Sequence, residues 1–202
     1  MADWEKILSM GNKEYIGGNT DEARGQFWQN YPRMAEVTDS VAGAYGIDPK
    51  TLRRALDREG FTDARIREHN EFKRRGEKVP DDQADRWLSS ETKPNTGYAE
   101  YGLDYVGNLI DEGKVKPKGA KFEYDEVVNE KSGKPSFAAN GYTHLDNISL
   151  TAAMLKYVAD TVKRDHPDLS DEEARRYVRA YYNRGVAGGR RWARNGAKGY
   201  ND

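Results

Sequence analysis

The feature that most constrains the fold is the segment Asn147–Arg164, an expected helix with apolar side chains on most of its sides. A helix with one apolar stripe covers a core from outside, whereas a helix that is apolar almost all round needs partners on every side. Pro167 ends the segment, because proline donates no backbone hydrogen bond. The chain is therefore expected to fold around this helix. The apolar positions are Ile148, Leu150, Ala152, Met154, Leu155, Val158 and Val162.

Helix signals recur on both sides of that segment. A helix is predicted from Arg33 to Tyr45, with Gly46 as its stop. The next helix has Asp48 as its N-cap and ends at Gly60. Further helices are expected at 64–75, 81–88 and 103–110, and a β-hairpin at 121–137. Near the C-terminus, Ser170 and Glu173 form a capping box, and the helix it opens is expected to break within 181–192.

These elements predict a mainly α (α+β) protein in which a helical domain carries one small β-hairpin. We expect an irregular N-terminal arm at 1–32 and one domain at 33–202, with a charged insertion at about 64–96.

Composition excludes several classes of protein. Thirty-three basic residues balance 34 acidic ones, for a net charge of -1, which argues against a dedicated nucleic-acid binder. The chain has no cysteine and three scattered histidines, so neither disulfides nor a zinc site are expected, and no cofactor is predicted. It has no signal-peptide pattern and no apolar run of about 20 residues. A soluble protein made in a cytoplasm is expected, and extracellular work would need another export route.

A carboxylate occupies a position where the helix pattern calls for an apolar side chain. Leu52, Ala55 and Leu56 follow helical spacing, and the next position on their stripe is Glu59. Burial there would raise the pKa of Glu59 and let it act as a general acid near neutral pH. Alternatively, Glu59 is half exposed and pairs with Arg58 or Arg65. The stripe leaves both interpretations open.

Three blocks of sequence resemble one enzyme family in the right order. They are "VAGAYGIDPKTLRRALDREGFTDA" (41–64), "GYAEYGLDYVGNLI" (97–110), and "NISLTAAMLKYVAD" with "VRAYYNRGVAGGRRW" (147–192). Together they are similar to the catalytic domain of soluble lytic transglycosylases and of the related goose-type and phage lysozymes. The resemblance implies a lysozyme-like fold. It also implies a muramidase that cleaves the β-1,4 bond between N-acetylmuramic acid and N-acetylglucosamine.

The resemblance also implies roles for particular residues. Glu59 matches the family's general acid/base, and Tyr182 and Asn183 match the turn that closes its substrate groove. On the opposite wall, Gly102 and Leu103 match a Gly-Leu pair. The other expected substrate-binding residues are Asn147, which starts the helix at the groove floor or merely caps it, and Tyr98 and Asp104 in the facing loop.

The route of cleavage depends on how many carboxylates take part. If Glu59 works alone, the sugar's own 6-hydroxyl or N-acetyl group attacks the anomeric carbon, as in the transglycosylases. A hydrolase needs a second acid to place water, for which Asp104 and Glu100 are the candidates. The choice stays open.

Three departures from the family pattern favour an alternative function. Gly60 stands where serine is usual, Asp104-Tyr105 where Met-Gln is common, and Arg184 where a small residue is common. A catalytically inactive lysozyme-like module with a structural or wall-binding role would tolerate all three. Without a signal peptide, either function would suit a phage product, borne in the virion or released to the wall as an endolysin.

The basic, aromatic C-terminal segment offers a rival partner. Arg190, Arg191 and Arg194 surround Trp192, a pattern that could contact phosphates and stack on bases. A solvated helix face is the simpler interpretation, and an anionic cell-wall polymer would be attracted equally well.

Overall fold

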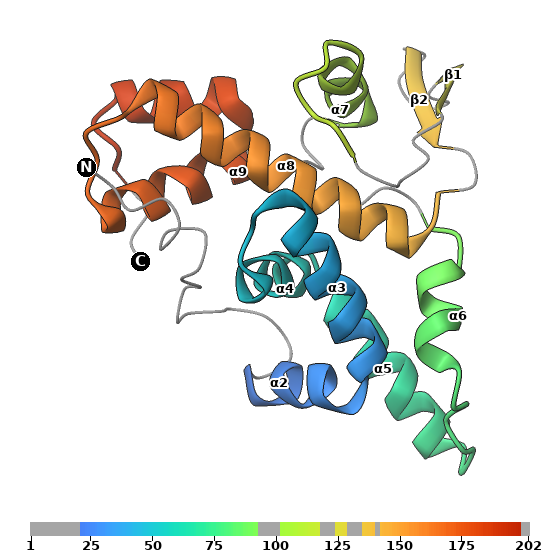
Figure 1. Ribbon diagram of the computed structural model, residues 1–202. Coiled ribbons are helices and arrows are strands. Elements are labelled where there is room, and N and C mark those ends of the chain that lie inside the picture. The colour runs from blue at the N-terminus through green and yellow to red at the C-terminus, as the bar shows by residue number, and fades with distance from the viewer. Residues whose placement is uncertain (1–20, 93–101, 118–123, 129–134, 140–141, 199–202) are drawn as a thin grey trace.

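The computed structural model describes residues 21–92, 102–117, 124–128, 135–139 and 142–198, which are mainly helical, as predicted (Figure 1). The helices are α2 (Asp21–Asn30), α3 (Pro32–Tyr45), α4 (Pro49–Arg58), α5 (Phe61–Arg74), α6 (Gln83–Ser89), α7 (Gly102–Asp111), α8 (His144–Asp165) and α9 (Asp171–Arg194). The strands are β1 (Tyr124–Val128) and β2 (Pro135–Ala139).

Helix α8 is the central element, as its apolar pattern predicts. It packs against α3, α4, α6 and α9, and it runs across the middle of the molecule in Figure 1. Ile148, Leu150 and Met154 are fully buried within it. The helix begins three residues earlier than predicted, because Thr143 and Asp146 form a capping box there. The expectation that Asn147 caps this helix was therefore wrong.

Most of the other predicted helix ends are confirmed. Gly46 closes α3 in the left-handed conformation, with φ 64°. The side chain of Asp48 accepts a hydrogen bond from the backbone of Thr51 and caps α4. Ser170 and Glu173 form the predicted capping box at the start of α9. Local signals of this kind need no tertiary partner, which is why sequence alone locates them.

The N-terminal arm is only partly as expected. Residues 1–20 lie outside the described residues, but residues 21–30 form helix α2, so the prediction of an irregular chain was wrong there. Phe27 and Trp28 of α2 are buried in the core. The Arg24 guanidinium donates two hydrogen bonds to Asp63 of α5, with N···O distances of 3.0 and 2.9 Å. Tertiary contacts therefore stabilise a helix whose own sequence is weakly amphipathic.

The predicted break within 181–192 is confirmed as a kink in helix α9. Gly185 has φ 66° and ψ 163°, which interrupts the helical geometry, yet the helix continues to Arg194. Four residues later, a Cβ built on Gly189 would lie 2.2 Å from the ring of Tyr181. Gly185 thus supplies the bend, and Gly189 allows the second half of the helix to pack directly on that ring.

The predicted hairpin and the predicted short helix before it are also present. Strands β1 and β2 pair antiparallel, with Tyr124 opposite Ala139. Helix α7 packs against β2, and in Figure 1 both lie on one side of α8, with α3 to α6 on the other.

Candidate active site

Glu59 lies at the C-terminal end of α4, where the chain turns directly into α5. Its backbone N–H donates to the carbonyl of Ala55 at 3.0 Å, so Glu59 caps the helix. Gly60 follows with φ 74°, a left-handed conformation that suits glycine, and α5 begins at Phe61. The tight turn therefore explains why a glycine stands where the resembled family usually has serine.

The Glu59 carboxyl is half-buried, and this burial dominates its chemistry. Loss of hydration raises the pKa of Glu59 from its ordinary 4.5 to about 7, while the charge of the adjacent Arg58 lowers it by less. The effect of burial thus exceeds that of the arginine. Arg65, the other candidate partner, instead contacts His144. A carboxyl with a pKa near 7 is protonated in a large fraction of molecules at neutral pH.

Tyr182 of α9 lies within electrostatic reach of Glu59. Its side chain is only 6% exposed. Burial is the main reason that the pKa of Tyr182 is well above its ordinary value, and the charge of Glu59 raises it further. Tyr142 contributes in the same direction. The end of α4 and the part of α9 before its bend therefore bring together the acid and the tyrosine that the resemblance pairs.

Two further buried residues, Tyr142 and Asn147, lie at the start of α8. Tyr142 is 1% exposed, and its hydroxyl donates to Oδ1 of Asn147 at 3.3 Å. Asn147 is also buried, and this hydrogen bond fixes the position of the Tyr142 hydroxyl. We refer to Glu59, Tyr142, Asn147 and Tyr182 as the Glu59 cluster. Sequence analysis missed Tyr142, because an isolated tyrosine before a helix carries no recognisable pattern.

The structure describes the other predicted site residues only in part. Asn183 is exposed, one residue beyond Tyr182 on α9. Gly102, Leu103 and Asp104 form the first turn of α7, and their side chains lie outside the described part of the chain, as do Tyr98 and Glu100. The opposite wall of the groove and the second acid therefore stay predictions.

A second buried acid, Asp57, lies on α4 two residues before Glu59. The indole N–H of Trp28 donates to its Oδ1 at 3.3 Å, and the hydroxyl of Thr62 donates to the same oxygen. Burial raises the pKa of Asp57 to about 6, although these two hydrogen bonds partly offset the effect. Asp57 lies off the apolar stripe of Leu52, Ala55 and Leu56, so periodicity alone would place it in solvent and gives no sign of its contact with Trp28.

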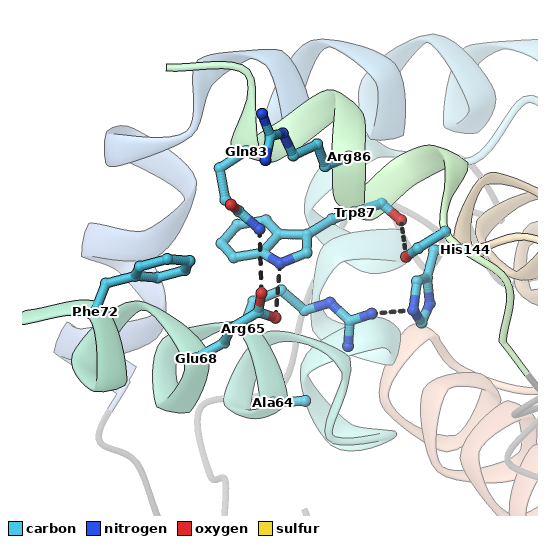
Figure 2. Close-up of a pocket in the computed structure, with 9 residues that line it drawn as sticks. Ala64, Arg65, Glu68, Phe72, Gln83, Arg86, Trp87 and His144 are labelled. Atoms are coloured by element: carbon cyan, nitrogen blue, oxygen red, sulfur yellow. Dashed lines mark hydrogen bonds between the residues drawn. The ribbon is translucent and has the colours of Figure 1, made fainter. Parts of the chain in front are cut away.

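A pocket of about 400 Å³ lies between α5, α6 and the start of α8 (Figure 2). Arg65 and His144 both line it, and their side chains contact each other. Sequence analysis did not identify this pocket. The helical spacing of Phe61, Arg65, Glu68 and Phe72 could have indicated it, because it places Arg65 on the same helix face as two phenylalanines.

The described part of the C-terminal segment does not form the stacking surface of the nucleic-acid alternative. Trp192 is 6% exposed, and its indole N–H donates to the carbonyl of Lys198 at 2.8 Å. Arg190 is paired with Asp165 at 2.7 Å. The tryptophan is thus part of the helix packing and does not present its ring to solvent.

Comparisons with family models, with curated proteins and with solved structures found no match to this chain. Among the described residues, no group of three or more His, Asp and Glu side chains could hold a metal ion. Within the same residues, no helix is both long and apolar enough to cross a membrane.

Proposed function

We propose that the protein is a muramidase that cleaves the β-1,4 bond between N-acetylmuramic acid and N-acetylglucosamine, with Glu59 as its general acid/base. One observation carries the proposal. A half-buried carboxyl whose pKa is raised to about 7 lies within electrostatic reach of buried Tyr182, which comes from a distant part of the chain. Groups with strongly perturbed pKa values that gather in this way are typical of sites that transfer protons.

Protonated Glu59 donates its proton to the glycosidic oxygen as the bond from that oxygen to the anomeric carbon breaks. The resulting Glu59 carboxylate then accepts a proton from the attacking hydroxyl. If that hydroxyl is the 6-hydroxyl of the same sugar, the product is a 1,6-anhydro sugar. If it belongs to water, the product is a reducing end. Either way Glu59 recovers its proton, which a pKa near 7 permits at neutral pH.

Among the described carboxylates near Glu59, Asp57 is the one to consider as a second acid. A second catalytic carboxylate has to reach the opposite face of the sugar. Asp57 already accepts hydrogen bonds from Trp28 and Thr62 within the core, so it is committed to the fold. Asp57 is therefore not the second acid, and the choice between the two routes depends on Asp104 and Glu100.

The test is the clearing of purified bacterial cell walls by the wild type, Glu59→Gln and Glu71→Gln. Glu71 is an exposed acid on α5, so its variant makes the same chemical change away from the cluster. We expect Glu59→Gln to lose roughly 10²–10⁴-fold in rate and Glu71→Gln to match the wild type. Equal rates for all three would remove Glu59 from the chemistry. Mass spectrometry of the fragments would distinguish anhydro from reducing ends.

The alternative function, an inactive structural or wall-binding module, predicts a different outcome. All three proteins would fold, and the wild type would bind walls in a sedimentation assay without clearing them. The exposed Arg184, which departs from the family pattern, is the observation that favours this alternative.

A further inference from the structure

The pocket between α5, α6 and α8 has the character of a binding site that the proposed glycan cleavage does not use. Its walls include Arg65, Glu68, Phe72, Gln83, Trp87 and His144. The segment after α6 pairs with the residue before α8 through a bridge between Glu91 and Thr143, which fixes the two walls relative to each other. Its volume of about 400 Å³ suits a small molecule.

Arg65 is a buried cation that lacks a carboxylate partner among the described residues. Its side chain is 9% exposed, and its guanidinium lies 4.5 Å from the centre of the Phe61 ring. Burial lowers the pKa of Arg65 to about 10, so the group is still charged at neutral pH. One Nη meets the ring of His144, the other donates to the carbonyl of Phe61 at 3.5 Å, and Nε has no hydrogen-bond partner. A buried charge without an ion-pair partner lowers the stability of the fold unless an anion binds to it.

Glu68 would be the natural counter-ion, but its two oxygens are already engaged. Gln83 donates to one of them at 3.1 Å and the indole of Trp87 donates to the other at 2.8 Å. Figure 2 shows these two bonds on one side of the pocket, and the Arg65 guanidinium directed away from them toward His144. The glutamate therefore braces the wall and forms no ion pair with the arginine, although its charge still raises the pKa of Arg65 in opposition to burial.

His144 adds a second unsatisfied donor. Burial and the charge of Arg65 lower the pKa of His144 to about 4, so the ring is neutral at physiological pH. Because Nε2 faces an Arg65 donor, Nε2 is the acceptor nitrogen and Nδ1 carries the hydrogen. Nδ1 is buried without a partner. His144 is also the first residue of the 22-residue helix α8, whose positive end favours an anion.

We propose that this pocket binds a carboxylate-bearing ligand of single negative charge, with the carboxylate on Arg65 and an apolar remainder against Phe72. A carboxylate matches the fork of a guanidinium, and it accepts the hydrogen bond that Nε of Arg65 has to offer. The nearby charge of Glu68 disfavours a dianion such as phosphate. This site is separate from the Glu59 cluster, and it stands whether or not the protein cleaves glycans.

The test measures binding of benzoate, of the neutral benzamide and of inorganic phosphate to the full chain, by calorimetry and by NMR of the His144 ring. We expect benzoate to bind at least about tenfold more tightly than benzamide or phosphate and to shift the His144 signals. Equal affinity for benzoate and benzamide would overturn the proposal. Tighter binding of phosphate would overturn the choice of ligand class.

Variants on α5 locate the effect. Arg65→Gln should weaken benzoate at least about tenfold, whereas Arg67→Gln, on the exposed face of the same helix, should leave it unchanged. Unchanged affinity in Arg65→Gln would contradict the assignment. If that variant fails to fold, the comparison of benzoate with benzamide on the wild type still decides, because it needs no substitution.

Discussion

Asp57 and Glu59, two residues apart at the end of α4, show how the same chemical group acquires different roles. Burial raises the pKa of both, to about 6 and about 7 respectively. For Asp57 the opposing influence is chiefly the hydrogen bonds from Thr62 and Trp28. For Glu59 it is the charge of Arg58, which is exposed to solvent. Asp57 is therefore fixed by hydrogen-bond donors inside the core, whereas Glu59 lies at the end of the helix with a pKa near 7.

The lesson is that burial alone does not identify a catalytic acid. A buried carboxylate that accepts hydrogen bonds from two core side chains serves the fold, because removing it leaves those donors unsatisfied. A carboxyl with a raised pKa that influences a distant tyrosine is suited to exchanging protons. Substitutions at the two positions should therefore affect different properties.

The largest expected difference is in activity. Glu59→Gln should reduce the rate of wall clearing by roughly 10²–10⁴-fold, because glutamine cannot transfer a proton. Asp57→Asn keeps an oxygen that can accept from Trp28 and Thr62, so its turnover should stay within about twofold of the wild type. A comparable loss in both variants would show that the two acids form one catalytic unit.

Stability should respond in the opposite order. Asp57→Ala leaves the Trp28 indole and the Thr62 hydroxyl without this acceptor, and should lower the free energy of unfolding by about 1–3 kcal/mol. Urea denaturation measures the change, with Asp57→Asn as the variant that retains the acceptor. Unchanged stability in Asp57→Ala would mean that these hydrogen bonds contribute nothing.

Tyr182 provides a smaller test of the Glu59 side. Tyr182→Phe keeps the buried ring and removes the hydroxyl, so we expect roughly a tenfold loss in kcat, less than for the acid itself. The matched control is Tyr181→Phe, whose hydroxyl bonds to Nε2 of His166 at 2.7 Å, away from the cluster. If Tyr181→Phe loses as much activity as Tyr182→Phe, helix packing and not the cluster is responsible.

The smallest effect is on the pH dependence of stability. The folded pKa of Glu59, about 7, exceeds the ordinary 4.5, so the folded state binds more protons than the unfolded state between these values. Stability due to this group is full below about pH 4.5 and falls as pH rises to about 7. Glu59→Gln removes that loss and should be about 1 kcal/mol more stable than the wild type at pH 8, after allowance for solvent screening. Thermal unfolding across pH measures the difference, and a constant difference at all pH values would contradict it.

The sequence located the helices far better than it located the site. Caps such as Asp48 and Ser170, and the apolar surface of α8, act through neighbours in the chain or through burial on every side, so they could be read directly. Helix α2 was missed because Phe27 and Trp28 are buried by residues distant in the sequence, such as Trp87 of α6 and Asp57 of α4. Glu59 and Tyr182 were predicted, but only through a family resemblance.

Other parts of the candidate site could not be predicted, because they depend on contacts between distant segments. Arg65 and His144 are 79 positions apart, and no local pattern joins them. The position of Tyr142 depends on its hydrogen bond to Asn147 in the first turn of α8, which no sequence pattern indicates. Periodicity shows that a side chain is directed inward, but not which side chain it meets there.

The most direct test of the central claim is a titration of the Glu59 side-chain carboxyl by ¹³C NMR, with Glu59→Gln to assign the signal. The claim predicts a midpoint near pH 7, well above the ordinary 4.5. A midpoint at or below 4.5 would mean that Glu59 is ionised throughout the neutral range. It would then have no proton to donate, which would contradict its role as the general acid.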